Sequence, residues 1–162
     1  MNENLRLLIE QLRVTHEKYG NSLQSAATNE DIERLCNAVK ERFEIELSSV
    51  YQSILLHTNG FNENGVFLYG SKTALIRGYS DRFLGGLLEE NENWHGVMDD
   101  LSKYLFYADS DIYIFGQSLE NNLFTCYAKE SFGDYLIFET DSDSVFFEKI
   151  LRLAIDDGFC LE

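Results

Sequence analysis

The sequence predicts an α+β fold in which N-terminal helices and a C-terminal helix pack against a mainly antiparallel sheet. Three observations support this prediction. Apolar residues recur at steps of three and four along residues 5–55, short runs rich in aromatic and β-branched residues follow residue 60, and a helical pattern returns from Asp143. Helices, then consecutive strands, then a helix are typical of α+β domains. The 162 residues are enough for one domain that buries roughly two thirds of its unfolded surface.

Three helices are expected before the Asn59-Gly60 pair. The first carries one apolar face and stops at Gly20, a residue that suits the position after a helix end. The second begins at residues 28–31, whose Thr-Asn-Glu-Asp sequence has the form of a capping box. Ser48 or Ser49 can cap the third, which ends at Asn59-Gly60.

The period of the pattern changes after Gly60. Residues 66–69 form a short apolar run between Asn-Gly and Gly-Ser pairs, as expected of a strand, and residues 72–76 can pair back onto it. Residues 81–94 are expected to be mainly helical, although two adjacent glycines there each cost a helix about 1 kcal/mol.

The second half of the sequence predicts a meander of antiparallel strands followed by a last helix. Its strand-like runs are joined by short polar turns and span residues 104–107, 112–115, 123–127 and 135–138. Because hairpins need only a few connecting residues, the run 123–127 is expected to pair antiparallel with the runs before and after it. The last helix starts near Asp143 and ends at Gly158.

Negative charge is concentrated in the second half of the chain. Residues 1–80 carry 8 Lys and Arg against 10 Asp and Glu, a net charge of −2, whereas residues 81–162 carry 5 against 18, a net charge of −13. Such a field disfavours nucleic acid and anionic membranes as partners and favours a basic protein. The alternative is that the charge serves solubility alone.

The sequence indicates a cytoplasmic protein. Its first residues lack the basic and apolar segments of a secretory signal, and its longest apolar run, residues 104–108, is far short of the roughly 18 residues that span a bilayer. The three cysteines, Cys36, Cys126 and Cys160, are far apart, which argues for reduced thiols. Cys36 and His57 lie on or beside apolar stripes, so we expect both to pack in the core.

No enzyme signature is present, so no catalytic, cofactor-binding or metal-binding residue is assigned. The chain has no phosphate-binding glycine loop, nucleophile elbow or zinc-binding spacing, and its three histidines are isolated. The Asp-Ser-Asp sequences at residues 109–111 and 141–143 offer oxygen ligands for a hard cation but lack the glycine and distal glutamate of an EF-hand. We expect each to make a turn or to cap the next element of the chain.

Three segments carry a family resemblance. The first is a helix pair that closes on Thr58-Asn59-Gly60 and is followed by the Val-Phe-Leu-Tyr-Gly run at residues 66–70. The second is the Glu-Asn-Glu-Asn-Trp run at residues 90–94. The third is residues 113–118 with the turn 120–122 and the aromatic run 124–127. In this order and spacing they resemble the SUKH superfamily, in particular its YrhA-like bacterial branch. One departure is Leu47-Ser48, where the family usually has Leu-Pro.

The resemblance implies a non-catalytic α+β domain that binds proteins, with residues 28–155 as the family core and residues 1–27 as an N-terminal helical extension. The superfamily includes fungal cell-wall-assembly regulators and many bacterial immunity proteins, which often mask toxins, including nucleases. The leading hypothesis is therefore an immunity protein that neutralises a basic toxin. The alternatives are a regulatory scaffold that binds a host protein and, from another class, a metal-dependent enzyme that uses the Asp-Ser-Asp loops.

The predicted partner-binding residues combine the acids of the second half with one aromatic residue. Trp94 is either a core anchor or an aromatic that faces the partner. The predicted set is Glu89, Glu90, Glu92, Trp94, Asp99, Asp100, Asp109, Asp111, Asp141 and Asp143.

Overall fold

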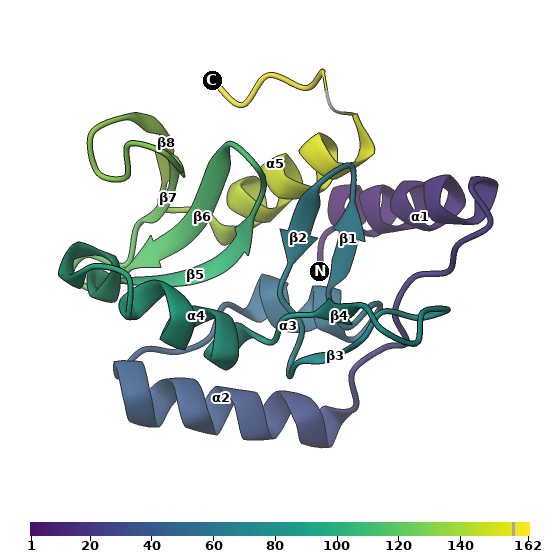
Figure 1. The fold of residues 1–162 in the computed structure, drawn as a ribbon, viewed down its shortest axis with the longest axis horizontal. Coiled ribbons are helices and arrows are strands. Elements are labelled where there is room, and N and C mark those ends of the chain that lie inside the picture. Colours follow the sequence, from purple (N-terminus) through teal and green to yellow (C-terminus); the bar gives the residue numbers. More distant parts are fainter. Residues whose placement is uncertain (157) are drawn as a thin grey trace.

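The computed structural model describes residues 1–156 and 158–162 and confirms the α+β class (Figure 1). Within these residues the helices are α1 (Glu3–Lys18), α2 (Asn29–Phe43), α3 (Ser49–Leu55), α4 (Leu87–His95) and α5 (Asp143–Ile155), with a 3₁₀ helix, η1 (Asp99–Lys103). The strands are β1 (Phe61–Glu63), β2 (Val66–Leu68), β3 (Ala74–Leu75), β4 (Phe83–Leu84), β5 (Tyr104–Asp109), β6 (Tyr113–Ser118), β7 (Phe124–Ala128) and β8 (Leu136–Thr140).

The large sheet has the order β1-β2-β5-β6-β7-β8, and every neighbouring pair in it is antiparallel. The predicted meander is confirmed, because β7 pairs antiparallel with both β6 and β8. Strand β1 was not predicted. It joins β2 through Asn64 and Gly65, whose φ angles of 49° and 73° suit the tight turn of a two-residue hairpin.

The expected helix caps are confirmed. The Thr28 side chain accepts a hydrogen bond from the Asp31 N–H, and the Asp31 side chain accepts one from the Thr28 N–H, which completes the capping box of α2. Ser48 caps α3 by accepting from the Tyr51 N–H, so a serine caps this helix without the proline of the family pattern. Helix α1 ends two residues before Gly20, which has a φ of 78°.

Two predictions between β2 and α4 are wrong. Residues 74–75 pair with β4 rather than with β2, because both edges of β2 are already occupied by β1 and β5. Residues 81–86 are not helical: α4 begins only at Leu87, and Gly86 is its extended N-cap. A Cβ at Gly86 would lie 2.5 Å from the backbone of Lys72 and Thr73, so this glycine permits a close crossing of two chain segments.

Two helix ends also differ from the prediction. Helix α3 ends at Leu55, and the chain continues as a turn in which the His57 N–H donates to the Ile54 carbonyl in the tighter i→i−3 pattern. His57 therefore lies beyond the helix and is exposed, contrary to its expected core packing. Helix α5 ends at Ile155 rather than at Gly158, since Asp156 is already extended.

Helices pack around the large sheet. In the view of Figure 1, α4 lies beside β5 on the side away from β6, whereas α5 and α1 lie behind the sheet. Helix α1 belongs to the expected N-terminal extension, yet its apolar face lies in the same hydrophobic core as α5. Cys36 is half-buried against this core, Cys126 is buried and Cys160 is exposed, and all three thiols are free. None of the described helices combines the length and apolar character needed to cross a membrane.

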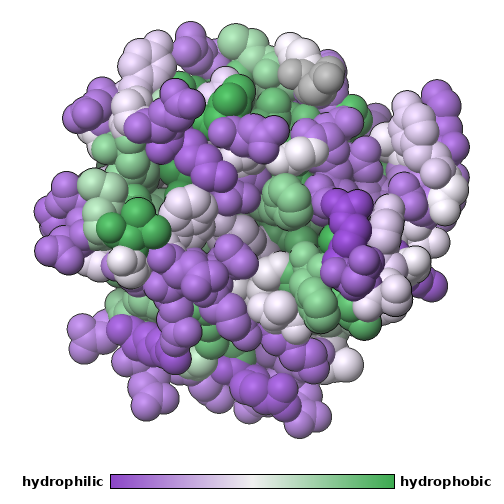
Figure 2. Space-filling model, viewed as in Figure 1, coloured by the Kyte–Doolittle hydropathy of each residue, from purple (hydrophilic) through white to green (hydrophobic). Residues whose placement is uncertain are grey.

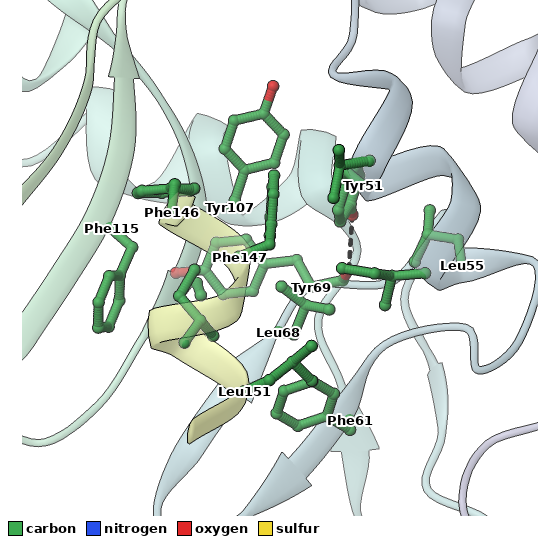
Figure 3. Packing of buried hydrophobic residues seen from close by; sticks show 14 of the residues in the cluster. Tyr51, Leu55, Phe61, Leu68, Tyr69, Tyr107, Phe115, Phe146, Phe147 and Leu151 are labelled. Atoms are coloured by element: carbon green, nitrogen blue, oxygen red, sulfur yellow. Dashed lines mark hydrogen bonds between the residues drawn. The ribbon is translucent and has the colours of Figure 1, made fainter. Parts of the chain in front are cut away.

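The α5 side of the sheet carries a dense aromatic core (Figure 3). Tyr107 of β5 lies with its ring centroid 4.9 Å from Tyr51 and 5.3 Å from Phe147, and Phe146 lies 4.9 Å from Phe147. The two buried hydroxyls are satisfied: Tyr51 donates to the Tyr69 carbonyl at 2.6 Å, and Tyr107 donates to the Gln117 side chain at 2.9 Å. Fully burying such side chains stabilises the fold by about 1.5 to 3 kcal/mol each.

Candidate functional site

Helix α4 is fixed on β5 by a buried asparagine. The Asn91 side chain donates to the Phe106 carbonyl at 2.8 Å and accepts from the Phe106 N–H at 2.7 Å, so it satisfies both backbone groups of one strand residue. At the end of α4, the His95 Nε2 lies 2.8 Å from the Tyr104 carbonyl. Because both contacts join helix to strand, they determine where the other α4 side chains lie.

Two glycines before α4 leave room for its acidic first turn. A Cβ at Gly85 would collide with the Glu90 side chain, and one at Gly86 would lie 2.5 Å from Glu89 Oε2. The Gly85 carbonyl also accepts from the Gly70 N–H at 3.0 Å, which ties this segment to the end of β2. The carboxylate of Glu90 therefore lies directly over the backbone that leads into its own helix.

Beside Glu90 is a surface pocket of about 250 Å³, which we name the α4 pocket. It is lined by Phe67, Tyr69, Phe83, Gly85, Glu90 and Asp109. Alternation along an extended chain puts Phe67 and Tyr69 on one side of the sheet. Asp109 pairs with Phe67 across the β2–β5 ladder, so it joins them at the pocket wall.

A bulge in β5 turns Asp109 toward the pocket. Phe106 packs on the α4 side, where its ring centroid lies 6.2 Å from that of Trp94. Strict alternation from Phe106 would put Asp109, three residues later, on the opposite side, in the aromatic core. The register shifts between Phe106 and Ala108, and this extra residue brings Phe106 and Asp109 to the same side.

Asp109 interacts with groups from two other parts of the chain. On the side of α4, the Trp94 Nε1–H donates to the hydroxyl of Tyr69, which lines the pocket beside Asp109, at 3.0 Å. Lys129 Nζ lies 3.2 Å from Asp109 Oδ2, 3.0 Å from the Ser110 carbonyl and 5.3 Å from the centroid of the Trp94 ring. A carboxylate, a carbonyl and an aromatic ring thus bind one internal cation.

Both pocket carboxyls have raised pKa values. Burial raises the pKa of Asp109, while the charge of Lys129 acts in the opposite direction. Burial also raises the pKa of Glu90, helped by the nearby charges of Asp109 and Glu89. Burial raises the pKa of the Tyr69 hydroxyl well above its usual value, so this group stays protonated at neutral pH. The surroundings of the two carboxyls therefore disfavour their charged forms.

The structure brings together three of the predicted partner-binding residues: Glu90 and Asp109 line the α4 pocket, and Trp94 adjoins it. Trp94 is half-buried, so neither interpretation of this residue as purely core or purely exposed describes it. Glu89 and Glu92 are exposed on the same helix, and Glu92 lies 3.0 Å from Arg42 of α2.

The other predicted acids lie elsewhere. Asp99 and Asp100 are exposed in η1, and Asp111 is exposed beyond β5. Asp141 is exposed beside the start of α5, and Asp143 accepts from the Ser48 hydroxyl at 2.9 Å. Asp143 therefore joins the starts of α3 and α5 and has a structural role.

The two Asp-Ser-Asp loops act as a turn and a cap, as predicted. Ser110 Oγ accepts from the Ile112 and Tyr113 N–H groups, and Ser142 Oγ accepts from the Val145 N–H at the start of α5. Among the described residues, no three His, Cys, Asp or Glu side chains are grouped so that they could share a metal ion.

Sequence reasoning missed Tyr69, Lys129 and Phe83 of this site. Tyr69 and Phe67 have the two-residue spacing of a shared strand face, which was the one available signal. Lys129 comes directly after β7 and reaches Asp109 only through the order of the strands in the sheet. Phe83 belongs to β4, in a segment predicted to be helical, and its side chain is 61% exposed.

Comparison with known proteins gives no match: no family model, curated protein or solved structure is significantly similar to this chain. The relationship to the SUKH superfamily therefore remains a proposal that depends on the three sequence segments. The function has to be argued from the α4 pocket and its surroundings.

Proposed function

We propose that this protein is a non-catalytic protein-binding domain of the SUKH type, and that it neutralises a basic toxin domain, such as a nuclease, as an immunity protein. The observation that carries the proposal is the α4 pocket. There, Glu90 and Asp109 lie beside aromatic side chains, and Lys129 binds Asp109 alone. A surface of this kind attracts positively charged groups and offers apolar area for them to cover.

The surroundings of the pocket support a protein as the ligand. Large apolar side chains are exposed next to the acids: Phe83 at the pocket rim is 61% exposed, and Val97 and Met98, just after α4, are 69% and 45% exposed. On the face that includes α4, hydrophobic residues form small separate groups within a mostly hydrophilic surface (Figure 2). Apolar anchors within a polar surround are typical of protein interfaces.

A regulatory scaffold would need the same acidic and aromatic surface. The two roles are therefore distinguished by whether the captured partner is toxic. Affinity purification with the protein as bait, followed by mass spectrometry, identifies the partner. The partner is then expressed alone and together with this protein in the same host cells. An immunity protein restores growth that the partner alone prevents. A partner that is harmless by itself would contradict the immunity role and favour the scaffold.

A further inference from the structure

We propose that the α4 pocket receives one arginine side chain of the protein partner. This inference rests on the proposed function, because the arginine belongs to the basic partner. It goes further by naming the group that is bound and the residues that bind it. Glu90 and Asp109 accept hydrogen bonds from the guanidinium, and the aromatic rings of the wall contact its faces.

The size of the pocket suits the end of one long side chain. Its volume of about 250 Å³ is roughly eight times the 30 Å³ that one water molecule occupies in the liquid. A helix or strand cannot enter such a space, whereas a side chain from a partner surface can. Phe83 is exposed at the rim, so a ligand that enters would also cover an apolar ring.

The pocket carries a negative charge that is not balanced by a neighbouring cation. Asp109 is already bound by Lys129, but no Lys, Arg or His among the described residues lies within 4.0 Å of the Glu90 carboxylate. Two carboxylates and one ammonium leave a net charge of −1 at the site. A ligand with a single positive charge would neutralise it and would relieve the repulsion between Glu90 and Asp109.

The geometry favours arginine over lysine. The guanidinium is flat and has five N–H donors, so it can lie against aromatic rings while it donates to two carboxylates. In the walls of the pocket, Phe67 and Phe83 provide the aromatic rings. Glu90 and Asp109 provide the two carboxylates. A lysine ammonium is compact and strongly hydrated, and the internal Lys129 already occupies the part of the site that suits it.

The test uses three capped tripeptides, Gly-X-Gly, in which X is arginine, lysine or citrulline, the uncharged counterpart of arginine. Binding is followed by the chemical shifts of backbone amides and by the fluorescence of Trp94, the chain's one tryptophan, which lies against Lys129. We expect the arginine peptide to bind with a dissociation constant on the order of 1 to 10 mM, as suits a single charged side chain over aromatic rings. The shifts should centre on Glu90, Asp109 and Phe83.

Matched variants locate the binding. Glu90→Gln removes the free carboxylate of the pocket and should weaken binding of the arginine peptide at least fivefold. Glu92→Gln removes the same charge from the same helix outside the pocket and should change it less than twofold. The lysine peptide should bind at least threefold more weakly than the arginine peptide, and the citrulline peptide should produce no saturable shift. Far-ultraviolet circular dichroism confirms that both variants are folded.

Several results would overturn the arginine pocket: equal binding of lysine and arginine, equal effects of the two variants, or shifts spread over the other acids. These failures are distinct from failure of the proposed function. If a toxic partner is captured and neutralised although Glu90→Gln has no effect, the pocket inference is wrong and the function stands. If the arginine peptide binds as expected but no partner is neutralised, the pocket inference stands and the immunity role is wrong.

Discussion

Both sides of the large sheet carry aromatic residues, but the side chains around these residues differ. On the α5 side, rings such as Tyr107 and Phe147 pack among other apolar groups, and the buried hydroxyls there have protein partners. On the α4 side, Trp94 and Tyr69 lie next to carboxylates and a lysine. The first arrangement maximises burial, whereas the second retains charge at a half-buried surface.

This difference separates stability from recognition. The pKa values of Glu90 and Asp109 are raised, which means that the folded protein disfavours their charged forms. A side of the sheet selected for stability alone would have neutral residues at these positions. We infer that the α5 side holds the fold together and that the α4 side keeps unfavourable charge because a ligand uses it.

The largest expected effect is on the α5 side. Phe147→Ala should reduce the free energy of unfolding by about 3 to 5 kcal/mol, since it leaves a cavity among close-packed rings. Val145→Ala on the same helix, at a side chain that is 42% exposed, should change it by less than about 0.5 kcal/mol. Urea denaturation measures both, and a mild effect of Phe147→Ala would show that stability does not depend on this side.

Trp94→Ala should have an intermediate effect on stability and a strong effect on binding. The half-buried ring contacts Phe106 and Lys129, so its loss should cost about 2 kcal/mol of unfolding free energy, less than for a fully buried tryptophan. Affinity for the partner should fall by about 2 kcal/mol as well. Trp94→Phe keeps most of the packing and serves as the control. If Trp94→Ala lowers the free energy of unfolding as much as the loss of a fully buried tryptophan does and leaves the affinity for the partner unchanged, Trp94 is a core residue only.

Lys129→Met should destabilise the fold by about 1 to 2 kcal/mol, because it leaves the half-buried Asp109 without its cation. Lys103→Met breaks an exposed pair, in which Nζ lies 3.7 Å from Asp100 Oδ1, and should cost less than about 1 kcal/mol. Thermal unfolding of the two variants gives the comparison. Equal losses would mean that the α4 side is no different from ordinary surface.

Glu90→Gln should have the smallest effect on stability and the opposite sign. The raised pKa of Glu90 means that the native state binds its proton more readily than the unfolded chain does. Its unfavourable contribution is therefore present at neutral pH and is relieved as the pH falls through the raised pKa toward the usual value of 4.5.

The variant should accordingly be slightly more stable than the wild type at pH 7, by no more than about 0.5 kcal/mol, and this advantage should shrink near pH 4. Differential scanning calorimetry at both pH values measures it. A destabilised variant at pH 7 would show that the charge of Glu90 stabilises the fold, so that no ligand is needed to explain its presence.

Local patterns in the sequence predicted most of the fold. The caps at Thr28 and Ser48 and the four strands of the meander depend on neighbours in the chain, and they lie where expected. The β3–β4 pairing and the start of α4 were wrong because they depend on which strand edges are free and on a crossing at Gly86. These are non-local properties.

The site was predictable only in part for the same reason. Glu90, Trp94 and Asp109 stand out by charge and aromatic character. Their meeting with Tyr69 and Lys129 depends on the strand order and on the bulge after Phe106, neither of which has a signal in a single sequence. Charge composition therefore identified candidate residues, whereas the register of the sheet decided which of them form a site.

The most direct measurement of the central claim is the association rate with the captured partner as a function of salt. For the wild type, the rate should fall as salt rises, because the Debye length shrinks from about 30 Å at 0.01 M to about 10 Å at 0.1 M. Combined neutralisation of Glu89, Glu90 and Glu92 to glutamine should lower the rate and flatten its salt dependence, with a smaller change in the dissociation rate. An unchanged, salt-insensitive rate for the triple variant would contradict the account and leave the acidic residues with solubility as their role.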